Sequence, residues 1–239
     1  ALLYLNQTAL DPDLKGPLAS LKPGPPPFEL RVQRRYNPEG ITQYNIVPGL
    51  IGVVLTMTMV MMTTLSMTRE RERGTMENLL ATPVRPIEVM AGKIVPFIIV
   101  GYLQVTIILA AAKLLFDVPM VGSLALLSAA SILFIAANLA VGFTFSTIAG
   151  NQLQAMQMGV FFFLPSILLS GFMFPFRGMP EWAQWLGEVL PLTHFLRIVR
   201  GILLKGNEAA EIVPELWPIA AFLLAAAAVA LLRYRETLD

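Results

Sequence analysis

The sequence predicts an all-α protein that crosses a membrane several times. Its 239 residues are 56% hydrophobic and 14% charged, with a mean hydropathy of +0.67, whereas soluble domains are roughly a quarter charged. Five apolar runs come close to the ~20 residues that a helix needs to cross a hydrocarbon core. They are residues 46–67, 94–116, 121–148, 153–174 and about 214–232.

The residue types present in the sequence argue against several classes of function. The net charge is +1, so nothing indicates a nucleic-acid partner. The sequence has no cysteine and one histidine, which argues against a metal site and against thiol catalysis. It has no G-x-x-x-x-G-K-[ST] motif, so ATP binding of the P-loop kind is not expected. The centres of the apolar runs lack carboxylates, which disfavours an ion-coupled carrier.

The first 45 residues are polar and rich in proline, which excludes a helix interior. From Phe28 to Gln33, apolar and polar side chains alternate with the period of a strand that has one buried face. The segment is either the last strand of a small domain or a disordered tail.

The first apolar run mixes methionine with threonine. Thr56 and Thr63 share one helix face, and Met59 lies between them. Methionine adapts to irregular apolar ligands, and threonine bonds across helices. Two interpretations of Thr56, Met59 and Thr63 are open. The residues form the wall of a cavity for amphiphilic substrates, or they pack helices together, and both can hold.

A charged hinge at residues 69–93 separates the first two runs. Gly74 breaks its charged run, Thr75 suits a helix cap, and Glu77 suits the first turn of the helix that follows. Pro83 ends this short helix. Its apolar stripe consists of Met76, Leu79 and Leu80. The pattern predicts a short amphipathic helix at the membrane surface or, more simply, an interfacial loop that reverses the chain.

Basic residues place the hinge in the cytoplasm by the positive-inside rule. The hinge carries Arg69, Arg71, Arg73, Arg85 and Lys93, and the C-terminal tail carries Arg233 and Arg235. The basic residues on the other side lie in longer segments, where the rule is weaker.

Residues 175–213 are too amphipathic to cross. Pro180 opens one expected helix, whose tryptophans suit a membrane interface, and Pro191 opens a second. Gly201 and Gly206 are expected to break the second helix. His194 suits a structural hydrogen bond near the helix start better than it suits catalysis. Two short helices dipping into the outer leaflet would satisfy their own backbone groups.

Two strings carry a resemblance to a known family. Glu72-Arg73-Gly74-Thr75-Met76-Glu77, followed by Leu80, Thr82-Pro83 and Gly92-Lys93, resembles the signature loop of permease subunits in the type 2 ABC exporter family. The resemblance implies that this loop contains the coupling helix that docks on the ATPase subunit. The implied ATPase-coupling residues are Glu72, Gly74, Thr75, Glu77, Leu80, Thr82 and Pro83.

The second string, Pro191-Leu192-Thr193-His194-Phe195 followed by Arg200-Gly201, is similar to the family's segment before the last span. There, re-entrant helices cap the translocation path on the outer side. The implied residues of this outer motif are Pro191, Thr193, His194, Arg200 and Gly201.

The resemblance also implies an architecture. Intact members have six spans, with an extracytoplasmic region after the first. We therefore expect residues 1–45 to be the end of that region and residues 46–239 to be the permease domain, with five transmembrane helices and the first span absent from the numbered sequence.

The implied function is that of a permease subunit of an ATP-driven exporter in the bacterial cytoplasmic membrane. ATP-binding cassette subunits, a second permease half and membrane lipid are the implied partners. The chain itself needs no cofactor, because ATP and magnesium belong to the ATPase. A hydrophobic or amphiphilic substrate suits the uncharged spans. The alternative is a non-transporting membrane scaffold that anchors a soluble partner.

Overall fold

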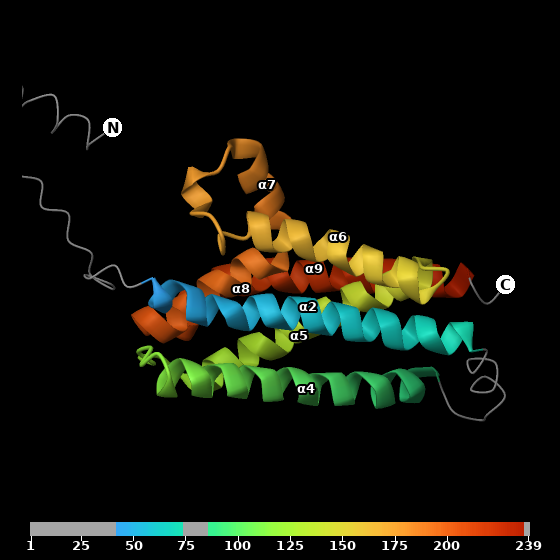
Figure 1. Ribbon diagram of the computed structural model, residues 1–239, viewed down its shortest axis with the longest axis horizontal. Coiled ribbons are helices and arrows are strands. Elements are labelled where there is room, and N and C mark those ends of the chain that lie inside the picture. The colour runs from blue at the N-terminus through green and yellow to red at the C-terminus, as the bar shows by residue number, and fades with distance from the viewer. Residues whose placement is uncertain (1–41, 74–85, 237–239) are drawn as a thin grey trace, which may run out of the picture. The chain divides into compact units, whose positions relative to one another are not determined.

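The computed structural model describes residues 42–73 and 86–236, and within them the regular structure is entirely helical. Five of these helices are long and apolar enough to cross a membrane, which confirms the predicted class. They are α2 (Gln43–Glu72), α4 (Pro86–Leu114), α5 (Leu124–Ile148), α6 (Gln152–Leu169) and α9 (Ala209–Glu236) (Figure 1). The strand predicted near Phe28 lies outside the described residues.

Four short helices connect α6 to α9. They are η2 (Phe176–Gly178), α7 (Glu181–Val189), α8 (Pro191–Arg200) and η3 (Gly201–Lys205). In Figure 1, α7 and α8 lie near the start of α2, whereas α2 ends at the opposite end of the bundle, beside the start of α6. We call these the hairpin end and the hinge end, and residues 181–200 the α7–α8 segment.

Helix α5 forms the centre of the bundle and packs against α2 and α9. At Gly142, the backbones of α5 and α2 approach so closely that an added Cβ would lie 2.8 Å from Val60 O. Thr64 Oγ1 donates a hydrogen bond to Gly142 O at 3.1 Å, and Thr144 Oγ1 donates to Ala226 O of α9 at 3.0 Å. Small residues and interhelical hydrogen bonds drive such contacts in lipid, where burial of apolar surface gains nothing.

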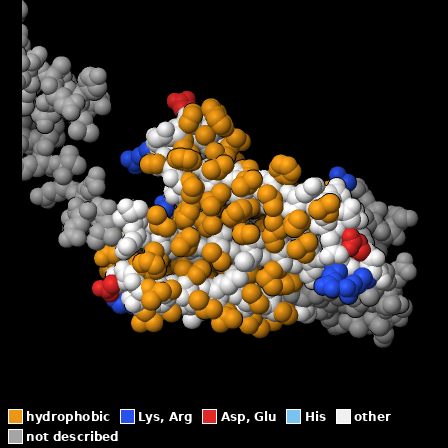
Figure 2. All heavy atoms as spheres, in the orientation of Figure 1, with side chains coloured by type: hydrophobic (Ala, Val, Ile, Leu, Met, Phe, Trp, Pro, Cys, Tyr) orange, Lys and Arg blue, Asp and Glu red, His pale blue; other side chains and the backbone are white. Residues whose placement is uncertain are grey.

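The outer faces of the bundle are apolar. Large hydrophobic side chains of α4, such as Ile99, Leu103 and Ile107, are exposed. Figure 2 shows hydrophobic side chains over the helices, with charged ones gathered toward the ends and on the projecting α7 region. This distribution suits a protein whose solvent is lipid.

Two helices differ in length from the apolar runs that predicted them. The fourth run was expected to continue to residue 174, but α6 ends at Leu169 because Gly171, with φ of 82°, reverses the chain. The fifth was expected to begin near residue 214, but α9 begins at Ala209 and contains Pro214. Its first turn forms because Glu211 Oε2 accepts a hydrogen bond from Glu208 N.

The α2–α5 contact yields a stability prediction. Gly142→Ala should destabilise the protein by about 1–3 kcal/mol, because the new Cβ overpacks the contact with Val60 and Thr63. Gly92→Ala is the matched control, since nothing lies within 4 Å of its Cβ position. Thermal unfolding of the two purified variants in detergent measures the difference; equal midpoints would contradict the close packing.

Candidate functional site

The α7–α8 segment turns sharply at Leu190. This residue keeps an extended conformation (φ −82°, ψ 129°), as expected before a proline. Pro191 then occupies the first turn of α8, where no backbone N–H is needed. Thr193 Oγ1 donates a hydrogen bond to Gly187 O at 2.6 Å and fastens α8 to the end of α7.

Helix α8 is buried in the hairpin end of the bundle. Phe195 stacks on Phe134 of α5, with ring centroids 4.0 Å apart, and the close approach of α8 leaves no room for a side chain at Gly52 of α2. The buried residues of α8 are Pro191, Leu192, Thr193, His194, Phe195, Leu196, Ile198 and Val199. Helix α8 is therefore part of the core, whereas most side chains of α7 are exposed.

Four charged or titratable side chains meet where α7, α8 and α9 converge. His194 Nδ1 lies 2.6 Å from Glu215 Oε2, and His194 Nε2 lies 2.8 Å from the main-chain oxygen of Glu188. Arg197 binds both carboxylates: Nη1 lies 3.0 Å from Glu188 Oε2 and 3.3 Å from Glu215 Oε2. We call Glu188, His194, Arg197 and Glu215 the polar cluster.

Electrostatics favour the charged form of both bases in the polar cluster. Burial alone would lower the pKa of His194, but its hydrogen bonds to Glu215 and to Glu188 O, with both carboxylate charges, raise the pKa above its ordinary value. Burial likewise opposes the charge of Arg197, and the same two carboxylates raise the pKa of Arg197. Its guanidinium also lies 4.8 Å from the centre of the Phe176 ring.

Arg200 and Gly201 of the predicted outer motif have separate roles. Arg200 Nε donates to Asn45 O and Nη1 donates to Gly171 O, both at 3.2 Å, which ties α8 to α2 and to the end of α6. Burial lowers the pKa of Arg200 below the ordinary arginine value. Helix α8 ends before Gly201, as expected, but Gly201 itself stays helical (φ −62°, ψ −49°) and begins η3, and the chain leaves the helix at Gly206, with φ of 72°.

At the hinge end, Glu72 joins α2 to α6. Its Oε1 accepts a hydrogen bond from Gln152 N at 2.7 Å, and its Oε2 accepts another from Gln152 Nε2. Both bonds lower the pKa of the Glu72 carboxyl below its ordinary value, and the bond from the Gln152 side chain has the larger effect. The other predicted coupling residues lie outside the described residues: Gly74, Thr75, Glu77, Leu80, Thr82 and Pro83.

The threonines and methionine of the first run lie inside the bundle. Thr56, Met59 and Thr63 are all buried. Thr56 Oγ1 donates to Gly52 O at 2.8 Å, whereas Thr63 Oγ1 has no hydrogen-bond partner among the described residues. The structure thus places the three in helix packing; a cavity wall would require the helices to separate, and that role stays a prediction.

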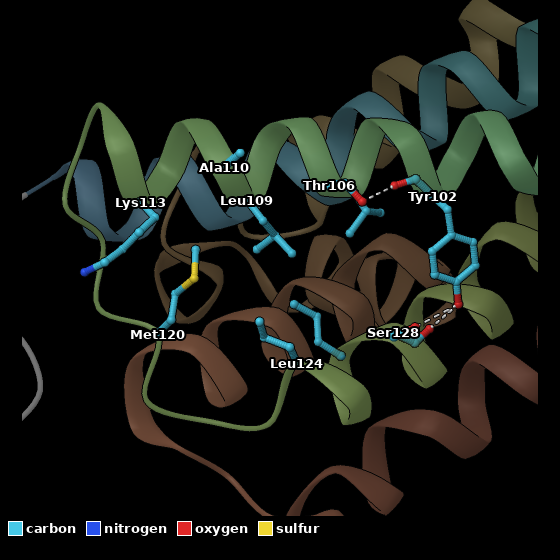
Figure 3. Close-up of a pocket in the computed structure, with 10 residues that line it drawn as sticks. Tyr102, Thr106, Leu109, Ala110, Lys113, Met120, Leu124 and Ser128 are labelled. Atoms are coloured by element: carbon cyan, nitrogen blue, oxygen red, sulfur yellow. Dashed lines mark hydrogen bonds between the residues drawn. The ribbon is translucent and has the colours of Figure 1, made fainter.

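A cavity of about 420 Å³ lies between α4 and α5 (Figure 3). At one end Tyr102 donates a hydrogen bond to Ser128 O, and at the other Lys113 Nζ pairs with Asp117 at 3.0 Å. The lining residues are Tyr102, Val105, Thr106, Leu109, Ala110, Lys113, Met120, Leu124, Leu127 and Ser128. None of the predicted site residues lines it.

His194 was predicted from the sequence as a residue of this region, but its partners Glu188 and Glu215 were not. Glu215 stands inside the last apolar run, and a carboxylate there is itself a signal, because burying one in a membrane requires a partner. The amphipathic segment before that run contains the candidates for that partner, and they include His194 and Arg197.

These features define a polytopic membrane protein with a charged hinge at one end and, at the other, a helical hairpin whose second helix, α8, is buried. A family model described as ABC-2 type transporter matches residues 29–204. The chain therefore belongs to the ABC-2 type transporter family.

Named relatives agree with this assignment. The chain is 37% identical over 199 residues to a probable multidrug ABC transporter permease, YbhR, of Escherichia coli K12, a match that covers 83% of this chain and 54% of that protein. It is 36% identical to the probable multidrug ABC transporter permease YbhS, covering 74% and 48%. It is 30% identical to the inner membrane transport permease YhhJ, a match that covers 89% of this chain and 57% of that protein. YbhS and YhhJ are from the same strain as YbhR. The chain spans about half the length of these relatives.

The role of Arg200 can be tested by stability. Arg200→Gln should destabilise the protein by about 1–3 kcal/mol, because Asn45 O and Gly171 O lose a charged donor. Arg177→Gln, at an exposed arginine on η2, controls for the loss of charge. Thermal unfolding in detergent checks both; equal effects of the two changes would show that the carbonyl contacts contribute nothing.

Proposed function

We propose that this chain is the membrane-spanning permease part of an ATP-driven ABC exporter, located in the bacterial inner membrane. Membership of the ABC-2 type transporter family carries the proposal. Two relatives named as ABC transporter permeases and a third named as an inner membrane transport permease support it. The arrangement of five apolar helices supplies the scaffold that such a role needs.

The energy is supplied by a separate ATPase subunit that docks on the hinge. The sequence has no P-loop motif, and the hinge carries the family-like string from Glu72 to Pro83. In this proposal Glu77 is a charge partner of the ATPase and Leu80 is an apolar knob. Magnesium and ATP belong to that subunit.

Structure at the hinge end supports a route for the coupling. Helix α2 continues without interruption from the hairpin end to Glu72, so a displacement of the hinge moves a rigid rod. The two hydrogen bonds of Glu72 to Gln152 extend the displacement to α6. Two neighbouring helices would thus shift together, in a rigid-body change of the kind that switches access.

A second permease half, identical or different, completes the transport path, and the substrate is hydrophobic or amphiphilic. The uncharged interiors of the spans support this substrate class, because a charged substrate would need charged partners there. Buried Thr56, Met59 and Thr63 would meet the substrate only in a state in which α2 separates from its neighbours.

Charge reversal in the hinge tests the proposal. Glu77→Lys should abolish substrate-stimulated ATP hydrolysis by the full-length protein and its ATPase in lipid bilayers, because the docking charge is inverted, while membrane insertion persists. Glu181→Lys, at an exposed position on α7, is the matched control and should leave hydrolysis unchanged. A chain that purifies without any nucleotide-hydrolysing partner would favour the scaffold function.

The link between α2 and α6 is tested separately. Gln152→Ala removes the side-chain hydrogen bond to Glu72 and should lower transport several-fold more than ATP hydrolysis, because only the main-chain bond from residue 152 then couples α2 to α6. Gln157→Ala, at an exposed position on the same helix, is the control. Equal loss of transport and hydrolysis would show that the link does not transmit motion.

A further inference from the structure

Both ring nitrogens of His194 face hydrogen-bond acceptors. The main-chain oxygen of Glu188, 2.8 Å from Nε2, can only accept, so Nε2 carries a hydrogen. Glu215 Oε2, 2.6 Å from Nδ1, also receives Arg197 Nη1 at 3.3 Å, and this cation favours an ionised carboxylate. Nδ1 therefore carries a hydrogen as well, and the geometry describes an imidazolium ion.

This charge is placed where it would be costly without its partners. His194 is 5% exposed, and an unpaired charge at that depth is unfavourable. The charged side chains that contact it among the described residues are Glu188 from α7 and Glu215 from α9, with Arg197 from α8 bonded to both. Two cations then face two carboxylates. Without the imidazole proton, the same set carries a net charge of −1.

We propose that the polar cluster is a proton-binding clasp, which fastens the α7–α8 segment to α9 when His194 is protonated and loosens it when the proton leaves. This inference rests on the proposed function for its meaning: the segment lies at the outer end of the transport path, and the clasp sets how readily that end opens. The proton exchanges with the outer solution, since Glu188 is 44% exposed.

Loss of the proton breaks the clasp at one of two places. A neutral imidazole keeps one N–H, so either Glu215 or the Glu188 carbonyl then faces a nitrogen lone pair. One bond to α9 or to the end of α7 is lost, and the carboxylates of Glu188 and Glu215 lose one of the two cations that face them. Arg197 remains, so the segment loosens without leaving the bundle.

The direction of the pH dependence follows from the raised pKa of His194. A base whose pKa is higher in the clasped state binds its proton more tightly there. Its stabilisation is complete below the ordinary histidine pKa, about 6.5, and is lost as the pH rises through the raised pKa. The clasp is closed in acidic outer solution and opens in alkaline solution.

Accessibility of a buried position on α7 tests the clasp. The sequence lacks cysteine, and Ala183 on α7 is 3% exposed, so Ala183→Cys places a protected thiol under the segment. The full-length protein, freed of other cysteines and joined to its ATPase, is labelled in liposomes with a membrane-impermeant maleimide between pH 6 and pH 9. Each rate is divided by the rate for the denatured protein at that pH, which removes the titration of the thiol itself.

We expect the normalised labelling rate to rise at least five-fold with pH. In His194→Gln the rise should disappear, because glutamine cannot change its charge. In Glu215→Gln, which retains the shape of the side chain, the rise should shift to lower pH, because the imidazolium loses its closest counter-charge. Asp117→Asn, in the Lys113 pair beside the α4–α5 cavity, should leave the rise unchanged.

A normalised rate that does not change with pH, or that changes equally in His194→Gln and Glu215→Gln, would overturn the clasp. Substrate-stimulated ATP hydrolysis is measured on the same liposomes. If hydrolysis is present but labelling is flat, the clasp fails and the exporter function stands. If labelling responds to pH but no hydrolysis occurs, the clasp stands as a pH-dependent device and the exporter function fails.

Discussion

Polar groups inside a bilayer have no water to bond, so each must find its partner within the protein. Helix α2 shows how this constraint shapes the chain. Its threonines Thr56, Thr64 and Thr68 return their hydroxyls to carbonyls one turn earlier, and Thr64 also reaches Gly142 O of α5. These three buried hydroxyls thus have acceptors within the protein, and the Thr64 bond fixes α2 to the central helix. A rigid α2 joins the hinge end to the hairpin end.

The same constraint explains how a charged cluster is tolerated near the membrane. Helix α8 turns Phe195 and its other apolar side chains into the bundle, where Phe195 stacks on Phe134. The polar side chains gather on the side that meets α7 and α9. Each carboxylate of the polar cluster has a cationic partner and each base has an anionic one, so the desolvation cost is met by short, charge-assisted bonds. Packing and charge pairing therefore act on opposite sides of one short helix.

Much of the fold was predictable from the sequence, because a run of apolar residues long enough to cross a bilayer has few alternatives to a helix. The ends of the helices were less predictable: Gly171 ends α6 early, and the turn before Pro214 extends α9 to Ala209. The candidate site was only half predictable. His194 stood out as the one histidine. Glu188 and Glu215 are 27 positions apart in the sequence, and they meet at His194 only because α8 packs against both α7 and α9. Periodicity describes one helix at a time and does not identify partners across helices.

The position of the clasp separates it from the driving force. A proton that drives transport must reach its site from both sides of the membrane in turn, which places the titrating group near the middle of the spans. His194 instead lies at the hairpin end, where its partner Glu188 is 44% exposed. In the proposed clasp the proton therefore exchanges with the solution at that end and does no net work on transport. It can change the stability of the hairpin end, while in the proposed exporter the energy comes from ATP hydrolysis by a subunit docked at the hinge end.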